Sequence, residues 1–416
     1  MKLNFGFGTG IQTIELPEEN LMGILTSNDV PHGKVDEEAV VEALENPIGT
    51  PRLRNIVHPG EKIAIITSDI TRPLPTYRIM PALLDELSAA GVSSEDIVLV
   101  FALGSHRGHT PEEQKKLAGE RAFAEIRCVD SDASDCVHLG DTTAGTPVDI
   151  TRVVAEADRR ICLGNIEYHY FAGYSGGAKA IMPGVSTPAA IQANHRMMVR
   201  PDACAGSLDG NPLRMDIEEA GRICGIDFIV NVVLDEAKHI VRAVAGDAVQ
   251  AHRVGCAFLD RMYLKDLDER ADIVVVSQGG TPKDLNLYQT QKALDNAKHA
   301  VKKGGTIILI GSCREGLGAK VFEEWMRNAP SAESMIERIG RDFQLGGHKA
   351  AAIAMVLQNA EIYLVSDLED SLVERIFLKP AHSAQAALDL ALARLGKDSK
   401  VLAMPYGGCT LPRVRT

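Results

Sequence analysis

The chain has 416 residues, a formal net charge of −12 at pH 7 and an apolar content of 45%. This length predicts two or three domains with cores of their own. The acidic balance argues against a nucleic-acid partner, and no run of about twenty apolar residues could span a bilayer. The amino terminus MKLNFGFGTG has no apolar signal core with a cleavage site, so we expect a cytoplasmic protein without a membrane partner.

The first half of the chain alternates apolar runs with helical patterns, which is typical of an α/β fold. A helix is expected at residues 75–90, and Thr110-Pro111-Glu112-Glu113 predicts a helix start with an N-cap, an early proline and a capping-box glutamate. The last two of the predicted strands are expected to pair antiparallel. The predicted strands are residues 62–68, 96–103, 160–164, 227–234 and 239–244.

A charged stretch at residues 259–272 predicts the boundary before a second doubly wound domain. The fold class is therefore α/β, with two α/β domains and an active-site cleft between them. The first domain is expected at residues 1–262 and the second at 268–404, with the tail, residues 405–416, returning to the first. Beyond the boundary, strands are predicted at 273–277, 306–310, 362–365 and 401–404, and helices at about 288–301, 320–328, 345–358 and 383–395.

Residues 165–195 form the most informative segment, because its centre has neither helix nor strand periodicity although it is rich in apolar and aromatic residues. Such a long loop inside a compact domain is usually functional. Its glycines let the backbone approach a ligand and offer N–H groups to an anion. Lys179 and His195 can each attack, bind a metal or move protons, depending on their surroundings.

Neither common phosphate motif explains this segment. A P-loop needs Gly before the Lys and Ser or Thr after it, whereas Lys179 lies between Ala178 and Ala180. The dinucleotide fingerprint fails at residues 6–10, because Ile11 stands where the third glycine belongs. The eight cysteines are scattered without a C-x-x-C pair, so a zinc ribbon or redox dithiol is not predicted either.

Polar groups follow the predicted strands, where functional residues of open α/β sheets gather. A single group of this kind is more often a helix cap, but four groups that each follow a predicted strand predict a shared site. The four are Ser68–Pro73, Gly104–Arg107, His169 and Gly279–Asp284.

These segments resemble the lactate racemase family, whose members use a nickel-pincer nucleotide. The resemblance covers nearly the whole chain and implies two α/β domains and a racemase or epimerase of 2-hydroxy acids. It is carried by SDITRP (68–73), GSHR (104–107), HYFAGYSGGAKAIMPG (169–184), NH (194–195), NPLRMDIEEA (211–220) and DLNLYQTQK (284–292).

The resemblance also implies how a cofactor would be held. In the family, the lysine of the SGGxK segment is joined covalently to nickel pyridinium-3,5-bisthiocarboxylic acid mononucleotide, and the matching residue is Lys179. The histidine of the NH pair supplies a nickel ligand, which here is His195. The SGG turn, Ser175, Gly176 and Gly177, then has a role in the cradle for the mononucleotide phosphate. Enzymes of cofactor synthesis are implied as indirect partners.

The chemistry explains two strand-end histidines. The hydrogen beside a carboxylate is weakly acidic, so it leaves more readily as hydride while a base takes the hydroxyl proton. The product is a planar 2-keto acid that can be reduced on either face. This scheme needs one acid/base per face, and histidine suits that role. His106 and His169 match the family's catalytic pair.

The substrate, a small 2-hydroxy acid, needs a cation for its carboxylate. Arg72 offers a bidentate contact, and Asp69 would orient Arg72 or a catalytic histidine. Tyr288, Gln289 and Lys292 can line one side of a helix start, and the resemblance assigns this group to substrate orientation. Lactate-acting relatives carry a tryptophan near the position of Phe343, where this chain has none, so a longer acid is as well favoured as lactate.

Two other classes of function remain open. A nicotinamide-dependent 2-hydroxy acid dehydrogenase would explain the α/β domains and hydride chemistry but lacks the glycine fingerprint. A non-catalytic nickel- or nucleotide-binding protein would keep Lys179 and His195. The presence of further functional residues together argues against it: His106, His169, Arg72 and Lys292. The segment Asn211–Ala220 fits the family pattern without an assignable chemical role.

Overall fold

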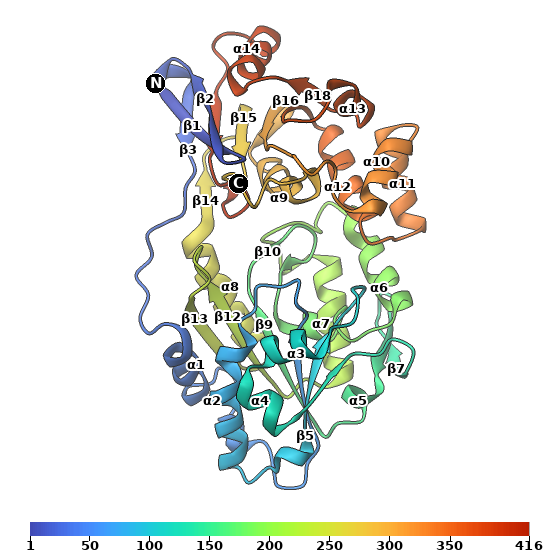
Figure 1. Ribbon diagram of the computed structural model, residues 1–416. Helices are drawn as coiled ribbons and strands as arrows, with labels where there is room; N and C mark the ends of the chain where they lie inside the picture. The colour runs from blue at the N-terminus through green and yellow to red at the C-terminus, as the bar shows by residue number, and fades with distance from the viewer. Residues whose placement is uncertain (416) are drawn as a thin grey trace. The chain divides into compact units, whose positions relative to one another are not determined.

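The computed structural model describes residues 1–415, which form two units (Figure 1). The central unit is Val30–Arg261, and the split unit combines Met1–Asp29 with the chain from Met262 onward. No helix in the described part of the chain is long and apolar enough to cross a membrane.

The central unit is built on a six-stranded sheet of order β13-β12-β9-β4-β5-β6, in which only the edge strand β13 is antiparallel. These apolar runs form strands because a sheet covered on both faces buries successive side chains alike. The strands are β4 (Ile63–Ser68), β5 (Ile97–Ala102), β6 (Arg127–Asp130), β9 (Arg159–Asn165), β12 (Phe228–Leu234) and β13 (Ile240–Gly246).

Helices cover both faces of this sheet. α1 (Asp36–Glu45), α2 (Thr76–Ala89), α3 (Pro111–Ala118) and α4 (Glu120–Glu125) share one core with alternate residues of β4 and β5. On the other face lie the single turn η4 (Gly177–Ala180) and the helix α8 (Gln250–Tyr263), which contact β9 and Ile166. The remaining elements are β7 (Cys136–Asp141), β8 (Pro147–Thr151), α5 (Arg152–Ala155), β10 (Tyr168–His169), β11 (Gly173–Tyr174), α6 (Pro188–His195) and α7 (Pro212–Cys224).

The strand order reverses beside β4. The chain runs from β4 to β5 and β6 on one side and then crosses to β9 and β12 on the other. Ligands of open α/β sheets bind at such a switch point, beyond the carboxyl ends of the strands. The ends of β4, β5 and β9 are adjacent, and they carry the SDITRP, GSHR and HYFAGYSGGAK segments.

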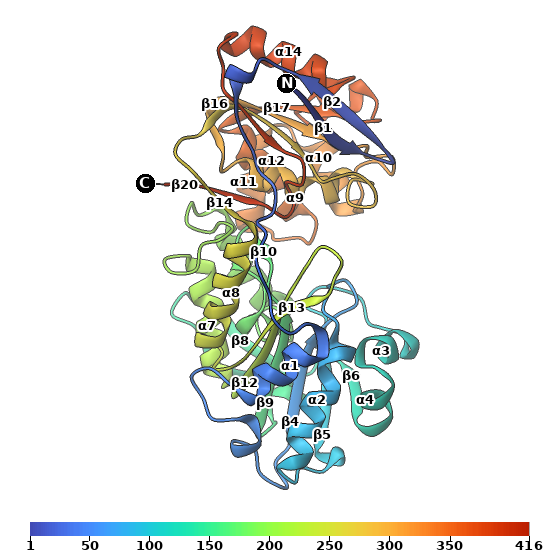
Figure 2. The same ribbon diagram turned by 90° about the vertical axis from the view of Figure 1, so that its left-hand side faces the viewer.

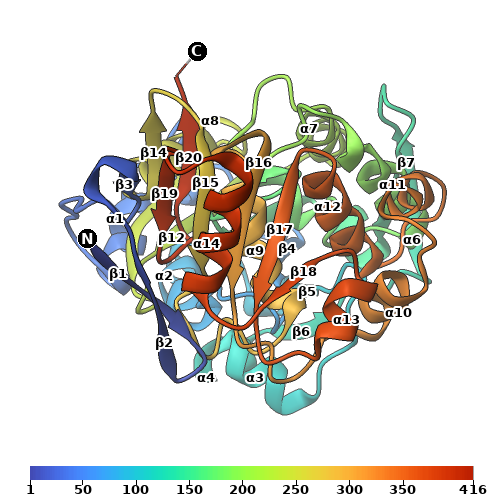
Figure 3. The same ribbon diagram turned by 90° about the horizontal axis from the view of Figure 1, so that it is seen from above.

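The split unit has a six-stranded parallel sheet of order β18-β17-β16-β15-β19-β3 (Figure 3). Its amino-terminal hairpin packs with α14 over one face (Figure 2). The strands are β1 (Lys2–Phe7), β2 (Gly10–Glu15), β3 (Leu21–Ile24), β14 (Leu264–Leu267), β15 (Ala271–Ser277), β16 (Val301–Ile310), β17 (Ala360–Val365), β18 (Lys379–Ala381), β19 (Val401–Met404) and β20 (Leu411–Val414). The helices are α9 (Leu287–Ala297), α10 (Lys320–Asn328), α11 (Ala332–Arg341), α12 (Gly347–Leu357), α13 (Asp370–Arg375) and α14 (Ala384–Leu395).

Both chain ends depart from the expected domain boundaries. Strand β3 is an edge of the sheet that the carboxyl-terminal half builds, where it pairs with β19. The tail strand β20 pairs in parallel with β14, so the tail belongs to the split unit rather than to residues 30–261. The reason is backbone pairing: each terminal segment completes hydrogen bonds that an edge strand would otherwise leave open.

Most strands lie where the apolar runs place them, and the Thr110 capping box is formed as expected. The helix expected at residues 288–301 is shorter and ends at Ala297, because the next strand already begins at Val301. Helix α8 occupies the first part of the stretch expected as a boundary, ending at Tyr263. The amphipathic helix α7 covers the segment Asn211–Ala220 that the resemblance left without a role.

Candidate active site

The loops that leave β4, β5 and β9 meet at the switch point of the central unit. Gly104, two residues beyond β5, donates its N–H to the Gly184 carbonyl at 2.9 Å. This hydrogen bond fixes the loop that carries His106 to the segment that carries Lys179. The strand-end groups predicted in this half of the sequence are therefore parts of one region.

His106 is oriented by Asp69. Its Nδ1 lies 3.0 Å from Asp69 Oδ2, and the Asp69 side chain is buried while His106 is about one-quarter exposed. Because an ionised carboxylate only accepts, Nδ1 carries the proton, and Nε2 is left with the lone pair of a base. Burial raises the pKa of Asp69, but hydrogen bonds from His106 and Thr71 outweigh it and lower that pKa to about 2.

A second histidine, His109, holds the same loop and was not predicted as a site residue. Its Nδ1 lies 2.7 Å from Asp130 Oδ1, and its Nε2 accepts the Ile70 N–H at 3.0 Å. A ring that donates through one nitrogen and accepts through the other is neutral. His109 therefore positions the backbone beside Asp69, and both of its ring nitrogens are engaged by the protein.

Arg72 extends from this loop into solvent. Within residues 1–415 its guanidinium forms no hydrogen bond or ion pair with another side chain, and the residue is exposed. Its charge contributes to lowering the pKa of Lys179, which places the two cations near each other. An exposed guanidinium beside a second cation favours an anionic ligand such as a carboxylate.

Phe171 connects three of the predicted site residues. Its buried ring lies edge-on to His169, with centroids 4.4 Å apart, and edge-on to His195 at 5.0 Å. Lys179 Nζ lies 6.0 Å from the same ring centroid. The His169 Nδ1 accepts the Ala172 N–H at 3.3 Å. The candidate base, the candidate nickel ligand and the lysine therefore all lie around one phenyl ring.

Lys179 lies in the single turn η4, only partly exposed. Burial lowers the pKa of Lys179 well below its usual value, and the charges of Arg214 and Arg72 lower it further. A lowered pKa favours the neutral amine over the ammonium ion, and the neutral amine is the nucleophilic form. Of the alternatives that the sequence left open for Lys179, these surroundings favour attack on an electrophilic group.

The glycine-rich turn before Lys179 is only partly available for an anion. The Ser175 hydroxyl donates to the Asn165 carbonyl at 2.7 Å and accepts the Glu167 N–H, and Gly177 N–H donates to Asn231 Oδ1 at 2.7 Å. These two residues of the predicted cradle are therefore engaged by the protein. Among the described residues the N–H groups of Gly176 and Ala178 have no protein acceptor.

Arg214, on α7, holds the carbonyl side of this turn. Its Nη1 donates to the carbonyls of Tyr174 at 3.2 Å and Gly176 at 3.4 Å. Its Nη2 lies 3.0 Å from His252 Nδ1, and His252 Nε2 lies 2.8 Å from the Ser175 carbonyl. Arg214 and His252 thus hold three successive carbonyls of this turn, those of Tyr174, Ser175 and Gly176.

Gly177 is required by this packing. With φ at +59° it has a backbone conformation that few side chains adopt, and an added Cβ would lie 2.8 Å from Arg214 Nη2. The Arg214 guanidinium is fully buried and its charge is compensated by Glu218, whose Oε1 lies 2.8 Å from Nε.

His195 ends α6 and is buried, with 7% of its surface exposed. Its Nδ1 lies 3.0 Å from Asn194 Oδ1. The Asn194 amide nitrogen donates to the Leu213 carbonyl at 3.2 Å and to Asp216 Oδ2 at 2.7 Å. In the part of the chain that the structure describes, no three His, Cys, Asp or Glu side chains gather as a metal site, so His195 is a single candidate ligand.

The remaining predicted residues lie on α9 of the split unit. Gln289 and Lys292 are exposed. The Tyr288 ring lies edge-on to Phe322, and Lys349 Nζ lies 4.1 Å from its centroid. Lys349, which lies on α12, was not predicted as a neighbour of Tyr288. Trp325 is a core residue, 1% exposed, whose Nε1 donates to Gln344.

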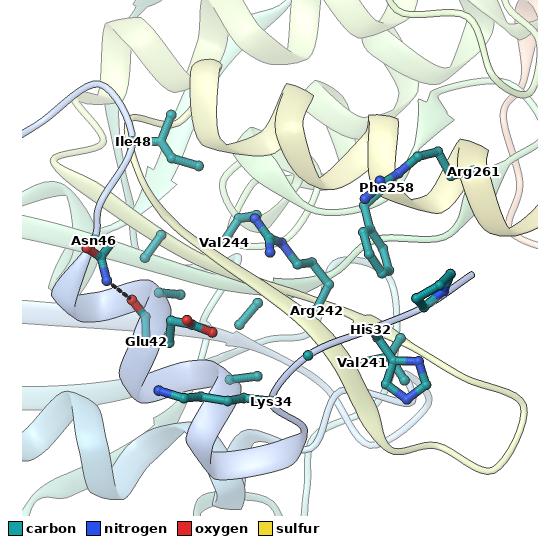
Figure 4. Close-up of a pocket in the computed structure, with 16 residues that line it drawn as sticks. His32, Lys34, Glu42, Asn46, Ile48, Val241, Arg242, Val244, Phe258 and Arg261 are labelled. Atoms are coloured by element: carbon teal, nitrogen blue, oxygen red, sulfur yellow. Dashed lines mark hydrogen bonds between the residues drawn. The ribbon is translucent and has the colours of Figure 1, made fainter.

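A cavity of about 420 Å³ lies elsewhere in the central unit (Figure 4). It is lined by the segment Pro31–Lys34, α1, β13 and α8, and Arg242 and Arg261 flank the Phe258 ring. It contains none of the predicted site residues. We place the site by chemistry, because the switch point holds the oriented histidine and the lysine.

A carboxylate-oriented histidine near a lysine and an exposed arginine, at the switch point of a doubly wound sheet, is typical of an α/β enzyme that acts on a small anionic molecule. The family follows from comparison with known proteins. Residues 7–206 match the lactate racemase N-terminal domain, and residues 267–411 match the lactate racemase C-terminal domain.

Two relatives are similar over almost their whole length. The lactate racemase of Thermoanaerobacterium thermosaccharolyticum is 35% identical over 419 residues, with 98% of each chain covered. The lactate racemase of Lactiplantibacillus plantarum is 34% identical over 407 residues, covering 95% of this chain and 96% of that protein. The chain belongs to the lactate racemase family and is an isomerase.

Solved structures agree with this assignment. The structure of the lactate racemase apoprotein from T. thermosaccharolyticum superposes with a TM-score of 0.89 at 34% identity over both complete chains. A crystal structure of a Thermotoga maritima protein has a TM-score of 0.64 at 19% identity, covering 93% of this chain and all of that one. The second likeness concerns the fold alone.

Several positioning residues escaped the sequence analysis, for a common reason. Phe171, His109, Asn194, Arg214 and Asp216 lie within or beside matched motifs, but each acts on another residue rather than on a ligand. The available signal was in α7: Arg214 and Asp216 flank its apolar stripe, where buried charges are expected only if they have partners.

Proposed function

We propose that this racemase inverts C2 of a 2-hydroxy acid, through a 2-keto acid and the reversible transfer of hydride. The observation that carries the proposal is the pairing of His106 with Asp69 at 3.0 Å, in a loop fixed to the lysine segment. It gives a base with a defined proton position next to a cationic ligand site. Racemisation requires such a base on each face of the substrate.

We propose that Lys179 carries the family's nickel-pincer nucleotide covalently and that His195 is its nickel ligand from the protein. The residues fit the group: the lysine amine has a lowered pKa, His195 Nδ1 faces an acceptor so that the lone pair is on Nε2, and two N–H groups of the glycine turn have no acceptor among the described residues. When bound, this cofactor would supply the centre that takes and returns the hydride.

The histidines handle the protons. Nε2 of His106 would take the hydroxyl proton of one enantiomer as C2 loses its hydride, and His169 would supply a proton as the 2-keto acid is reduced on the opposite face. Asp69 keeps Nδ1 protonated and stabilises the imidazolium that forms. Phe171 places His169 beside the lysine segment, where it would serve the opposite face of the substrate.

Cations would bind the carboxylate. Arg72 is exposed and its guanidinium matches a carboxylate in a bidentate manner. On the sequence pattern alone, we also propose that Tyr288, Gln289 and Lys292 orient the substrate and polarise its oxygen. The single tryptophan of the chain, Trp325, is a core residue, so we propose acids longer than lactate as substrates as well as lactate.

The deciding experiment produces the protein together with the cofactor-synthesis enzymes and measures intact mass, followed by peptide mapping. We expect an adduct on Lys179 that Lys179→Ala abolishes together with all activity. The control Lys116→Ala, an exposed lysine of α3, should keep both. His195→Ala should keep the adduct and lose nickel.

Activity is then measured by chiral chromatography on lactate, 2-hydroxybutyrate, malate, phenyllactate and an aldonic acid. One methylene in an apolar pocket changes the barrier by only about 1–3 kcal/mol, so graded rates are expected. An adduct on another lysine contradicts the cofactor assignment. Activity that needs added nicotinamide nucleotide would indicate a dehydrogenase instead, and a loaded protein inactive on all five acids would indicate a binding protein.

A further inference from the structure

Helix α7 carries two buried charges that no catalytic role has absorbed. Arg214 is fully buried and Asp216 is 2% exposed. Successive residues of an α-helix are about 100° apart around its axis, so residues 214 and 216 are about 160° apart by the shorter way round. Their side chains therefore leave opposite flanks of the apolar stripe that contains Ile217. Arg214 reaches the turn before Lys179, and Asp216 reaches the residue before His195.

The Asp216 carboxylate is fully used. Its Oδ1 accepts a short hydrogen bond from the Thr142 hydroxyl, and its Oδ2 accepts from the Thr146 hydroxyl at 2.7 Å and from Asn194 Nδ2 at 2.7 Å. A buried carboxylate with three donors is held in one place. The two threonines belong to the β7–β8 hairpin, so α7 and that hairpin fix the carboxylate together.

Asp216 determines which way the Asn194 amide points. The amide nitrogen donates to Asp216 and to the Leu213 carbonyl, and both are acceptors. The amide oxygen must therefore face His195 Nδ1, 3.0 Å away. An amide oxygen can only accept, so the Nδ1 of His195 has to carry the proton. The lone pair of the neutral ring is then on Nε2.

We propose that Asp216 and Asn194 are positioning residues that fix the tautomer of His195, so that Nε2 is the atom offered to a metal. Ligating histidines commonly donate their other N–H to such a partner, and losing that partner typically costs about 10- to 100-fold in metal affinity or activity. The inference rests on the proposed role of His195 as nickel ligand, but the tautomer itself is a property of the apoprotein.

The first test is the tautomer, observed by long-range ¹H–¹⁵N NMR of apoprotein labelled on its twelve histidines. The His195→Gln variant identifies the signals of His195 by their loss. We expect the Nδ1–H form to dominate in the natural protein and both tautomers to be populated in Asn194→Ala. A dominant Nε2–H form in the natural protein, or an unchanged Nδ1–H form in Asn194→Ala, overturns the proposal.

Exchanging the two side chains separates positioning from mere folding. Asp216→Asn alone lets the Asn194 amide turn, and a mixture of tautomers is expected. In the double variant Asn194→Asp with Asp216→Asn, the carboxylate at 194 again accepts from His195 and from the new amide, so the Nδ1–H form should return. Failure of this rescue, with the double variant folded, contradicts the assignment. Glu219→Gln, which alters a partly exposed carboxylate of α7 paired with Thr143, is the matched control.

The second test follows nickel. In protein produced with the cofactor-synthesis enzymes, Asn194→Ala should keep the Lys179 adduct and bind nickel about 10- to 100-fold more weakly, measured as metal per adduct during dialysis against a chelator. Equal retention in Asn194→Ala and the natural protein contradicts the role in metal binding. If no adduct forms on Lys179, the proposed cofactor chemistry fails, while the NMR result stands independently.

Discussion

His195 and His106 lie in contrasting surroundings. We call the loop that carries His106 the open end of the candidate site, and the surroundings of His195 its buried end. His195 is 7% exposed and is hydrogen-bonded to the buried Asn194. Asn194 in turn donates to the Asp216 carboxylate, which has three donors. His106 has a single charged partner, Asp69, and about one-quarter of its side chain is open to solvent. One ring is therefore held in a fixed state, whereas the other can exchange its proton.

This difference shows how one fold supports two uses of the same residue type. A metal ligand needs a constant lone pair, which burial and complete hydrogen bonding provide. An acid/base needs to change its protonation in every turnover, which requires an open nitrogen and a partner that stabilises the charged form. Lys179 belongs with the buried end, because burial there lowers its pKa.

The largest expected effect tests the open end. Replacing His106 or His169 with asparagine should lower the rate of racemisation about 100- to 10,000-fold, in both directions, because each turnover uses one base per face. Initial rates from each pure enantiomer give the measurement. His138→Asn changes a surface histidine, 54% exposed and paired with Asp149, and should keep the natural rate.

If one of the two variants keeps the natural kcat/KM, the histidine that it replaces is not a catalytic base. If the double variant keeps most of its activity, neither is a catalytic base and the comparison between the open and buried ends loses its functional meaning. Cofactor loading has to be measured in each variant by intact mass, so that a loss of rate is not caused by a loss of the adduct.

The next prediction tests the buried end through Arg214. Replacing it with leucine removes the partner of two carbonyls and of His252 and leaves their acceptors unsatisfied. Breaking a buried charged network of this kind typically costs about 3–5 kcal/mol of unfolding free energy. Urea unfolding followed by circular dichroism measures it.

Arg222→Leu, at an exposed position of the same helix, is the control and should change stability by less than about 0.5 kcal/mol. Equal stabilities for the two variants would show that the turn before Lys179 is held without Arg214. A cost confined to Arg214→Leu supports the view that the buried end is built by its hydrogen bonds.

The sequence predicts the residues of the open end better than those of the buried end. The strands before Asp69, His106 and His169 follow from apolar periodicity, and the polar residues follow from their positions at strand ends. The partners of His195 do not, because Asp216 lies 21 residues later and contacts Asn194 only through the fold. Single-sequence patterns report local spacing, whereas Arg214 and Asp216 act across long sequence separations.

The split unit shows the same limit in its backbone. Its strands β15, β16, β17 and β19 were predicted from apolar runs, but the place of the amino-terminal strand β3 at the edge beside β19 was not. A short strand such as Leu21–Ile24 has little periodicity of its own. Its position depends on the open edge that the distant strand offers.

The smallest expected effect concerns the link between Asp69 and His106. The pKa of Asp69 is lowered from 3.8 to about 2, so the unfolded chain binds its proton at higher pH than the native protein does. The stabilisation, about 2 kcal/mol by linkage, is fully present above about pH 5, roughly halved near pH 3 and lost as the pH falls through about 2. The difference in unfolding free energy between the natural protein and Asp69→Asn should therefore shrink by about 1 kcal/mol from pH 6 to pH 3. Asp85→Asn, at a position 67% exposed on α2, controls for general charge effects. A difference that stays constant over this range would mean that Asp69 and His106 are not coupled in the native state, and the open end would then lack the oriented base on which the proposed chemistry depends.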